Sequence, residues 1–459
     1  MTDTSDDTRA VKGVQKELRR LRKAQQLRNR ELILLIFAIA LTGGAFVLVQ
    51  FGAIGEIRLP ILYAVGALCA LAIALHVVLR IRASQADPFL VPIGLLLTGL
   101  GTAMIYRLDL QDKQSSAMTQ LAYAALSIAL CGLLVWALSN YRVLFRYTYI
   151  FGLTGIVLLI LPFVPFLHGG GNATVWITIA GFNFQPGEIA KICLAIFFAG
   201  YLVNTRESLT STGRRVLGFT FPRAREFGPL LVIWLISMGI IVAQRDLGTG
   251  MLIFGMFVAM LYVATGKTGW VLIGVTLAGV GAVAATFVMP YVHNRFNAWI
   301  NAFDDELYND PAGGSFQLVN GVFGLAHGGM FGTGLGQGRP YLTPVAKSDY
   351  IIPSLGEELG LVGIFAILGL YLVFASRGAR IGVAGQDDFG KLLSVGLSFT
   401  IALQVFIMVG GVTRVIPLTG LTTPFLAAGG SSLLANWLIV GILLRISDAV
   451  RRQPRAVIG

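Results

Sequence analysis

The amino-acid sequence predicts an all-α, polytopic membrane protein with about twelve transmembrane helices. Of the 459 residues, 55% are hydrophobic and only 13% are charged, and the mean hydropathy is +0.76. The apolar residues form long blocks, and most charged residues lie at the edges of these blocks. A soluble domain of this length does not need so much apolar surface, so the composition excludes that class.

A block is interpreted as a membrane span when it offers roughly 20 apolar residues, enough to cross about 30 Å of hydrocarbon. The block at 187–203 is short, and the stretch 227–265 is a tight hairpin, so these assignments are the least certain. In chain order, the predicted spans are 32–54, 59–79, 89–106, 117–138, 148–167, 187–203, 228–244, 247–265, 269–290, 355–376, 390–410 and 424–444.

Lysine and arginine are concentrated in alternate connections between these blocks. The connection 204–227 is rich in arginine, whereas the much longer segment 291–353 is poor in it. The positive-inside rule therefore places 204–227 and both termini in the cytoplasm, which requires an even number of spans. The net charge of +12 is explained by cytoplasmic loops next to anionic membrane lipids, and no nucleic-acid partner is expected.

The chain is divided at the sequence level into four parts. Residues 1–31 form a basic cytoplasmic segment, for which one interpretation is a short helix lying at the membrane surface. The apolar block that follows is too long for a cleavable signal. Residues 32–88 carry two additional spans, 89–447 carry a ten-helix core, and 448–459 form a basic cytoplasmic tail. The three cysteines fall in apolar blocks and the four histidines lack ligand spacing, so no disulfide framework, zinc site or haem site is expected.

Two outer segments, 168–186 and 291–353, are too long to be simple connectors. Long ordered loops in compact proteins are usually functional. Glycine-rich stretches in these segments, such as "AHGGMFGTGLGQG", permit tight turns and a close approach of the backbone to a ligand. This stretch lacks the Gly-Lys-Ser/Thr ending of a Walker loop, so a nucleotide site is not predicted.

Charged residues within or beside apolar blocks are candidate functional residues, because burying a charge in a membrane is costly. Glu188 and Lys191 lie three residues apart in "QPGEIAK", and Arg245 and Asp246 occupy the tip of a hairpin in "AQRDLGTG". Arg414 lies in "GGVTRVIPLTGLTTP". The structural alternatives are an internal ion pair for the first two residues and a helix N-cap for Asp246.

A second group of candidates consists of Trp176, the acid pair Glu357 and Glu358, and Asp349. Trp176 has an alternative role in the aromatic belt at the membrane surface. The acid pair has an alternative role beside the N-terminus of the tenth predicted helix, which is the preferred interpretation for Glu357. Asp349 lies well before that predicted helix, on the outer side, and has no comparable structural explanation.

Five motifs in order make the chain similar to the SEDS family (shape, elongation, division and sporulation proteins) over roughly 89–447. They are "WITIAGFNFQPGEIAK", "QRDLGTG", "SFQLVNGVFGLAHGGMFGTGLGQG", "KSDYIIPSLGEELGLVG" and "GGVTRVIPLTGLTTPFLAAGGSSLLANW". The chain most resembles the elongation branch, and the two additional spans resemble those of actinobacterial members. Arg245 replaces the proline that is usual in the second motif.

The resemblance implies a peptidoglycan glycosyltransferase that polymerises lipid II at the outer face of the bacterial cytoplasmic membrane, with roles in cell shape and elongation. Asp349 matches the family's essential aspartate and is expected to act as the general base. Trp176 is expected to help form an outer cavity, and Lys191 and Asp246 are expected to pair inside the bundle. Glu188, Arg245, Glu358 and Arg414 complete the set of substrate-binding or cavity candidates.

The resemblance also implies partners and a cofactor. A divalent cation, Mg²⁺ or Mn²⁺, is expected near Asp349, and no organic cofactor is expected. The expected partners are lipid II, the growing lipid-linked glycan, membrane lipids and a class B penicillin-binding transpeptidase. Two other functions remain as alternatives at this stage: a lipid II flippase and a non-catalytic scaffold for a penicillin-binding protein. No inverted repeat is visible in the sequence, which argues against the flippase.

Overall fold

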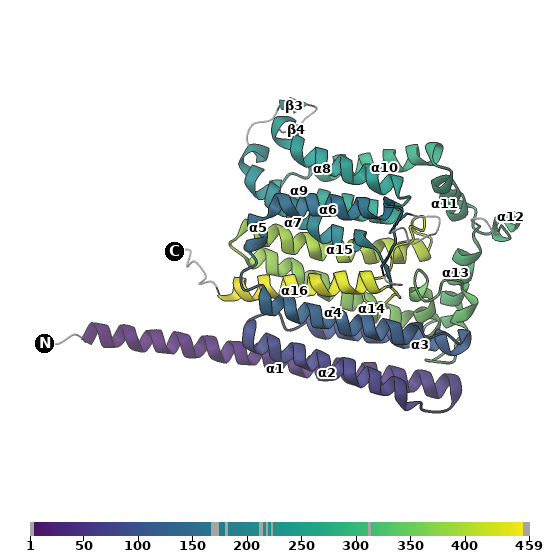
Figure 1. Cartoon of the computed structure of the whole chain (residues 1–459), viewed down its shortest axis with the longest axis horizontal. Coiled ribbons are helices and arrows are strands. Elements are labelled where there is room, and N and C mark those ends of the chain that lie inside the picture. The colour runs from purple at the N-terminus through teal and green to yellow at the C-terminus, as the bar shows by residue number, and fades with distance from the viewer. Residues whose placement is uncertain are drawn as a thin grey trace.

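The computed structural model describes residues 4–166, 174–179, 182–210, 214–216, 219–221, 224–310 and 314–452. These residues form a bundle of roughly parallel and antiparallel helices, with a layer of short helices across one end (Figure 1). The glycine-rich residues near 170, in the first outer segment, lie outside the described ranges.

Hydropathy located the helices correctly. Ten helices in the described part of the chain are long and apolar enough to cross a membrane, and two shorter apolar helices, Thr148–Phe163 and Val232–Ala243, accompany them. Each of the twelve predicted blocks falls on one of these helices. The chain is therefore a multi-pass membrane protein, as predicted.

The helices and strands have the following bounds. The helices of the first half are α1 (Thr4–Ile54), α2 (Leu59–Arg82), α3 (Leu90–Asp112), α4 (Ser116–Ala137), α5 (Val143–Arg146), α6 (Thr148–Ile160), η1 (Leu161–Phe163), α7 (Pro186–Thr210) and α8 (Ala224–Ala243). Those of the second half are α9 (Leu247–Thr265), α10 (Gly269–Val288), α11 (Pro290–Ile300), α12 (Asp305–Tyr308), α13 (Phe316–Gly328), η2 (Pro340–Leu342), α14 (Ile351–Ala384), α15 (Asp388–Val412) and α16 (Gly430–Arg452). Two antiparallel hairpins lie in the connections: β1 (Ile177–Ile179) with β2 (Phe182–Phe184), and β3 (Arg214–Val216) with β4 (Phe219–Phe221).

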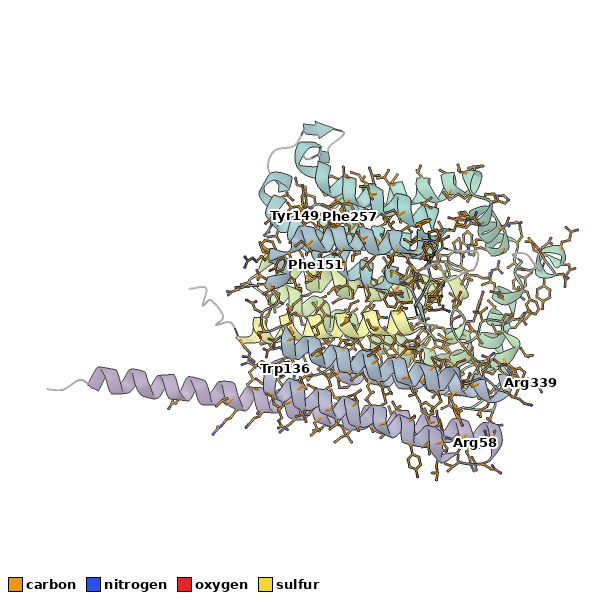
Figure 2. All side chains as sticks on the ribbon, in the orientation of Figure 1. Arg58, Trp136, Tyr149, Phe151, Phe257 and Arg339 are labelled. Atoms are coloured by element: carbon orange, nitrogen blue, oxygen red, sulfur yellow. The ribbon has the colours of Figure 1, made fainter. Side chains whose placement is uncertain are left out.

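The two ends of the bundle differ in the way that the charge pattern predicts. Both termini lie at one end, and α11, α12 and α13 lie at the other (Figure 1). Arg58 and Arg339 mark this second end, and Trp136 lies near the first (Figure 2). Because the connections at the first end carry most of the arginine, that end is cytoplasmic and the α11–α13 end faces outward.

The basic N-terminal segment corrects one prediction. It is not a separate surface helix, because α1 runs without interruption for 51 residues from Thr4 into the first span and extends beyond the bundle (Figure 1). Residues 14–31 contain no glycine or proline and are dominated by strong helix formers, so nothing in this sequence ends the helix.

The helices differ strongly in how much of their surface is buried. Helices α3, α7 and α16 are enclosed by other helices, and α4 packs along α16 as α6 does along α7. Helix α10 is peripheral, and only Gly274 is buried along its length. An all-apolar helix with so little protein contact is solvated by lipid.

Helix α14 contains a break that shapes the outer end. At Gly360 the backbone leaves the helical conformation, with φ 70° and ψ −176°. A Cβ atom at this position would lie 2.2 Å from the amide nitrogen of Gly332, so both the dihedral angles and the close approach require glycine. The break separates a short outer segment, which begins at Ile351, from the membrane-spanning part.

Candidate active site

A cavity of about 610 Å³ lies at the outer end of the bundle. It is enclosed by α11, the segment around α12 and α13, the loop before α14 and the loop after α15. The lining residues are Arg295, Ala298, Trp299, Tyr308, Asn309, Asp310, Gly314, Phe316, Gln317, Leu318, Pro344, Asp349, Tyr350, Leu418 and Gly420. Among these described residues, Asp310 and Asp349 are the carboxylates and Arg295 is the cation.

Asp349 is half-buried and lines this cavity, but its setting differs from the predicted one. Helix α14 begins at Ile351, so Asp349 lies immediately before a helix and not well before it. The amides of Ser348 and Tyr350 both donate to the carbonyl of Val345, at 3.1 and 3.3 Å. Val345 itself has φ 55°, a strained conformation for a β-branched residue. Such strain persists only where neighbouring contacts enforce it.

Lys347 supplies one of these contacts. Its ammonium group lies 2.8 Å from Asp109 Oδ1 and 3.1 Å from Asp112 Oδ2, and it also donates to Gln114 Oε1 at 3.0 Å. The Lys347 carbonyl accepts from the amide of Ala428 at 2.8 Å. This lysine therefore ties the Asp349 loop to the end of α3.

Arg295 is the cation that faces Asp349. Its Nη1 donates to the carbonyl of Thr419 at 2.9 Å, which fixes the guanidinium beside the loop after α15. Arg295 Nη2 and Asp349 Oδ2 lie 3.6 and 3.9 Å from the place that a Cβ atom of Gly420 would occupy. A side chain at position 420 would therefore enter the space between the two charged groups.

Burial raises the pKa of Asp349 above its ordinary value, and the hydrogen bond from Ser348 and the charge of Arg295 oppose this rise. A carboxylate with a raised pKa is a stronger base once it is deprotonated. The cavity therefore contains a group that can accept a proton from a bound hydroxyl and a nearby group that can stabilise an anion.

Glu358 does not line the cavity. It is 1% exposed, and its carboxylate accepts from Arg107 Nε at 3.0 Å and from the amide of Gly336 at 2.8 Å. Arg107 also donates to the carbonyl of Gly338 at 2.9 Å. Both carboxylate oxygens of Glu358 are therefore bound within the protein.

Glu357 is engaged in a similar way, which corrects the interpretation that it complements a helix N-terminus. It lies in the second turn of α14, and its Oε1 accepts from the amide of Arg339 at 2.7 Å and lies 3.1 Å from His327 Nδ1. Several glycines of 328–338 permit a close approach of the backbone, as the sequence predicted, and they bring it against these two glutamates.

Lys191 has a different partner from the predicted one. Its ammonium group contacts Glu188 Oε2 at 2.5 Å and Gln404 Oε1 at 3.2 Å, and no ion pair with Asp246 is formed. Glu188 lies on the same face of α7, one turn before the lysine, so it meets the charge without any help from another helix. Gln404 in turn donates to the carbonyl of Thr422 at 2.7 Å.

Asp246 and Arg245 lie at the turn between α8 and α9. Asp246 caps α9 by accepting from the amide of Thr249 at 3.0 Å, which is the structural alternative that its position allowed. Arg245 is exposed and has φ 62°, a left-handed conformation that a proline ring cannot adopt.

Trp176 and Arg414 are not among the residues that line the cavity. Trp176 is half-buried directly before β1, and this segment is joined to the α8–α9 turn by a 3.3 Å bond from the amide of Thr174 to the carbonyl of Gln244. Arg414 donates to the carbonyl of Trp299 at 3.1 Å, and Trp299 Nε1 donates to the carbonyl of Arg414 at 3.0 Å. Arg414 therefore holds one wall of the cavity in place.

The donor groups in the cavity fit one kind of divalent-cation site. The described part of the chain contains no cluster of three His, Cys, Asp or Glu residues, so it offers no cage built from protein ligands alone. Mg²⁺ commonly uses one or two carboxylates together with phosphate oxygens of a substrate. Asp349, with Asn309, Asp310 and Gln317 in the same cavity, supplies oxygen donors suited to that arrangement.

Comparison with known proteins agrees with this arrangement of motifs. The sequence model of the FtsW/RodA/SpoVE family, described as cell cycle protein, matches residues 88–452. The chain belongs to this family. It is 44% identical to the peptidoglycan glycosyltransferase RodA of Mycobacterium tuberculosis over 436 residues, covering 93% of this chain and 92% of the relative. It is 43% identical to the Mycobacterium leprae protein of the same name over 435 residues, covering 94% and 92%.

Solved structures show the same family fold. One, from work on the structural coordination of polymerization and crosslinking by a peptidoglycan synthase complex, has a TM-score of 0.63 at 23% identity, covering 80% of this chain and 99% of that chain. A mutant of the rod shape determining protein RodA of Thermus thermophilus has a TM-score of 0.54 at 21% identity, with the same coverage.

Two residues of this family member were missed as functional candidates from the sequence. Arg107 directly follows the predicted span 89–106, and Arg295 lies in the outer segment 291–353. A charge directly at the end of a predicted span, as at Arg107, should have raised the question of a buried partner. Arg295 carried no comparable signal, because its neighbour Asp349 lies 54 positions further along the sequence.

Proposed function

We propose that the chain is a peptidoglycan glycosyltransferase that polymerises lipid II at the outer face of the cytoplasmic membrane. The observation that carries this proposal is the presence of Asp349 and Arg295 in one cavity at the outer end of the bundle. The mycobacterial relatives named peptidoglycan glycosyltransferase cover nearly the whole chain, which supports the reaction class and a role in cell shape.

Asp349 is the general base in this proposal. In lipid II the donor sugar is α-linked to a lipid pyrophosphate and the product linkage is β, so the acceptor attacks from the face opposite the leaving group. The acceptor hydroxyl is a poor nucleophile near neutral pH, and a positioned base contributes roughly 10²–10⁴ in rate. Asp349 takes the hydroxyl proton as the new bond to the anomeric carbon forms.

Arg295 assists departure of the lipid pyrophosphate. Negative charge grows on the leaving oxygen as the glycosidic bond breaks, and a fixed guanidinium stabilises it without reorganising. The bond from Arg295 to the carbonyl of Thr419 provides that fixed position. This hydrogen bond uses Nη1 of Arg295. The other terminal nitrogen, Nη2, therefore remains directed toward the space beside Gly420.

A divalent cation, Mg²⁺ or Mn²⁺, is part of the proposal. Asp349 would hold it together with oxygens of the substrate pyrophosphate, and Asn309, Asp310 and Gln317 line the remaining volume. When bound, such an ion neutralises charge on the leaving pyrophosphate. Proton acceptance still falls to the free oxygen of Asp349.

A class B penicillin-binding transpeptidase is the proposed partner, and lipid II and the growing glycan are the proposed substrates. The similarity to a structure from a peptidoglycan synthase complex supports an assembly that joins polymerisation to crosslinking.

The test uses the purified full-length chain, supplied with its transpeptidase partner, magnesium or manganese, and labelled lipid II. Gel analysis should reveal glycan chains from the wild type and none from Asp349→Asn. Lys113→Gln is the matched control, since Lys113 is an exposed charge at the same outer end. Headgroup translocation without polymer would indicate a flippase, and neither activity would indicate a scaffold; either result would overturn the proposal.

A further inference from the structure

Another cavity, lined by charged and apolar side chains, lies at the cytoplasmic end of the bundle, far from the outer site. Its volume is about 150 Å³, which corresponds to about five water molecules. It lies between the last turns of α14 and α16 and the connection from α2 to α3. The lining residues are Asp87, Arg377, Arg380, Ile381, Ala384, Ser447, Val450 and Arg451.

The cavity carries a net positive charge. Three arginines and one aspartate line it, which leaves two positive charges uncompensated. Asp87 is 1% exposed and is shared by two of the arginines, since Arg377 Nε lies 3.0 Å and Arg451 Nη2 lies 2.7 Å from its Oδ2. Arg380 has no hydrogen bond or ion pair with the described residues.

Ser447 is a further polar group at this cavity, and its hydrogen bonds are not satisfied within the protein. It is 1% exposed, and its hydroxyl has no hydrogen-bond partner, although it lines the cavity. A buried hydroxyl without a partner costs free energy, so an acceptor in the cavity would stabilise it. The neighbouring Asp448 is not that acceptor, because its carboxylate is bound by Arg452 at 2.8 Å and by the amide of Gln85 at 2.9 Å.

We infer that this cavity binds a phosphate group, supplied by the headgroup of an anionic phospholipid of the inner leaflet. Arg380 and Arg377 offer charge-assisted donors, and Ser447 offers a hydroxyl donor. The aliphatic side chains of Ile381 and Val450 line the same cavity and suit the glycerol part of a lipid better than a free ion. Basic pockets between helices on the cytoplasmic side are suited to anionic headgroups.

Native mass spectrometry of the detergent-purified full chain, titrated with phosphatidylglycerol, tests this inference. Phosphatidylcholine and inorganic phosphate are titrated in parallel. The wild type should bind one phosphatidylglycerol far more tightly than phosphatidylcholine. Arg380→Gln should weaken that affinity about tenfold or more, and Ser447→Ala several-fold, as expected for one charge-assisted and one neutral hydrogen bond. Arg380 is exposed, so its replacement should leave the melting temperature unchanged.

Arg142→Gln is the matched control. The Arg142 side chain is 53% exposed at the same end of the bundle, outside the cavity, and its replacement should leave the affinity within about twofold. Displacement of bound phosphatidylglycerol by millimolar inorganic phosphate would support the phosphate site and identify the headgroup phosphate as the recognised group. Equal binding by wild type and Arg380→Gln, or equal weakening by Arg142→Gln, would show only general attraction of lipid to a basic surface and would overturn the inference.

Discussion

Asp349 and Glu358 lie nine residues apart at the outer end of α14, yet their surroundings are opposite. Glu358 is fully buried, and both of its oxygens are bound, one by Arg107 and one by the amide of Gly336. Asp349 is half-buried at the edge of a 610 Å³ cavity, with Arg295 nearby but no ion pair within 4 Å.

The difference shows how to separate a structural acid from a reactive one. If Glu358 gained a proton, the charge of Arg107 would be buried without a counter-charge. Burying an unpaired charge costs several kcal/mol of stability, about 3–5 kcal/mol in typical cases. Asp349 has free lone pairs that face a cavity, so it can exchange a proton with a bound molecule. The sequence motif places both carboxylates in one run, and only their hydrogen-bond partners distinguish them.

The largest effect should come from Asp349→Asn. The amide keeps the size of the side chain but cannot accept a proton, so polymerisation should fall by roughly 10²–10⁴. The melting temperature should change little, because the carboxylate has few partners to lose. Glu358→Gln should give the reverse result, a lower melting temperature with most of the activity per folded molecule retained. Near wild-type polymerisation by Asp349→Asn would mean that Asp349 is not the base.

The next prediction concerns the stability of the region around the buried pair of Arg107 and Glu358. Arg107→Met should cost roughly 3–5 kcal/mol, because it leaves Glu358 buried without its counter-charge. The double variant Arg107→Met with Glu358→Met removes both charges and should regain much of that loss. Denaturation of the single and double variants in the same detergent measures the coupling. Simple additivity of the two losses would show that the pair does not interact.

Hydropathy was sufficient to predict the membrane-spanning helices, and the charge pattern placed Asp349 at the end of the bundle opposite to both termini. Ion-pair partners were harder to predict, because pairing depends on side-chain reach and helix rotation. Lys191 was assigned to Asp246 across the bundle, whereas Glu188, three residues away, is the closer partner. The break at Gly360 was missed because a glycine inside an apolar block gives no sign of the loop that will pack against it.

Sequence patterns also could not predict that α1 continues past the membrane surface or that Arg295 faces Asp349. A helix continues past the membrane surface when no residue ends it, and hydropathy does not report that. Arg295 became a candidate only when folding brought α11 beside the loop that carries Asp349.

Arg295→Gln should have an intermediate effect with a distinctive pH dependence. Loss of the guanidinium should lower polymerisation by roughly 10–100-fold, since one preorganised charge on the leaving group is removed. Its positive charge also opposes the rise in the pKa of Asp349, so that pKa should rise further. A general base must be deprotonated to act, and the acidic limb of the pH–rate profile should therefore move to higher pH.

Arg295→Lys is the control for this effect. It keeps the positive charge, so the acidic limb should stay near the wild-type position even if the rate falls. An Arg295→Gln profile that coincides with the wild-type profile would show that Arg295 does not influence Asp349.

The smallest effect should come from Lys347, which affects only the geometry of the loop that carries Asp349. Its contacts with Asp109 and Asp112 hold the strained loop that precedes Asp349. Lys347→Met should allow that loop to relax, which lowers kcat several-fold while KM changes little, because a small displacement of a catalytic group is costly. The acidic limb should not move, since Arg295 remains in place, and this separates a positioning residue from an electrostatic one.

Lys113→Gln, at an exposed position near the same end of α3, should leave kcat unchanged. If Lys347→Met behaves like Lys113→Gln, the lysine is a surface charge, and the rigidity of the loop must come from its backbone bonds to Val345 and Ala428.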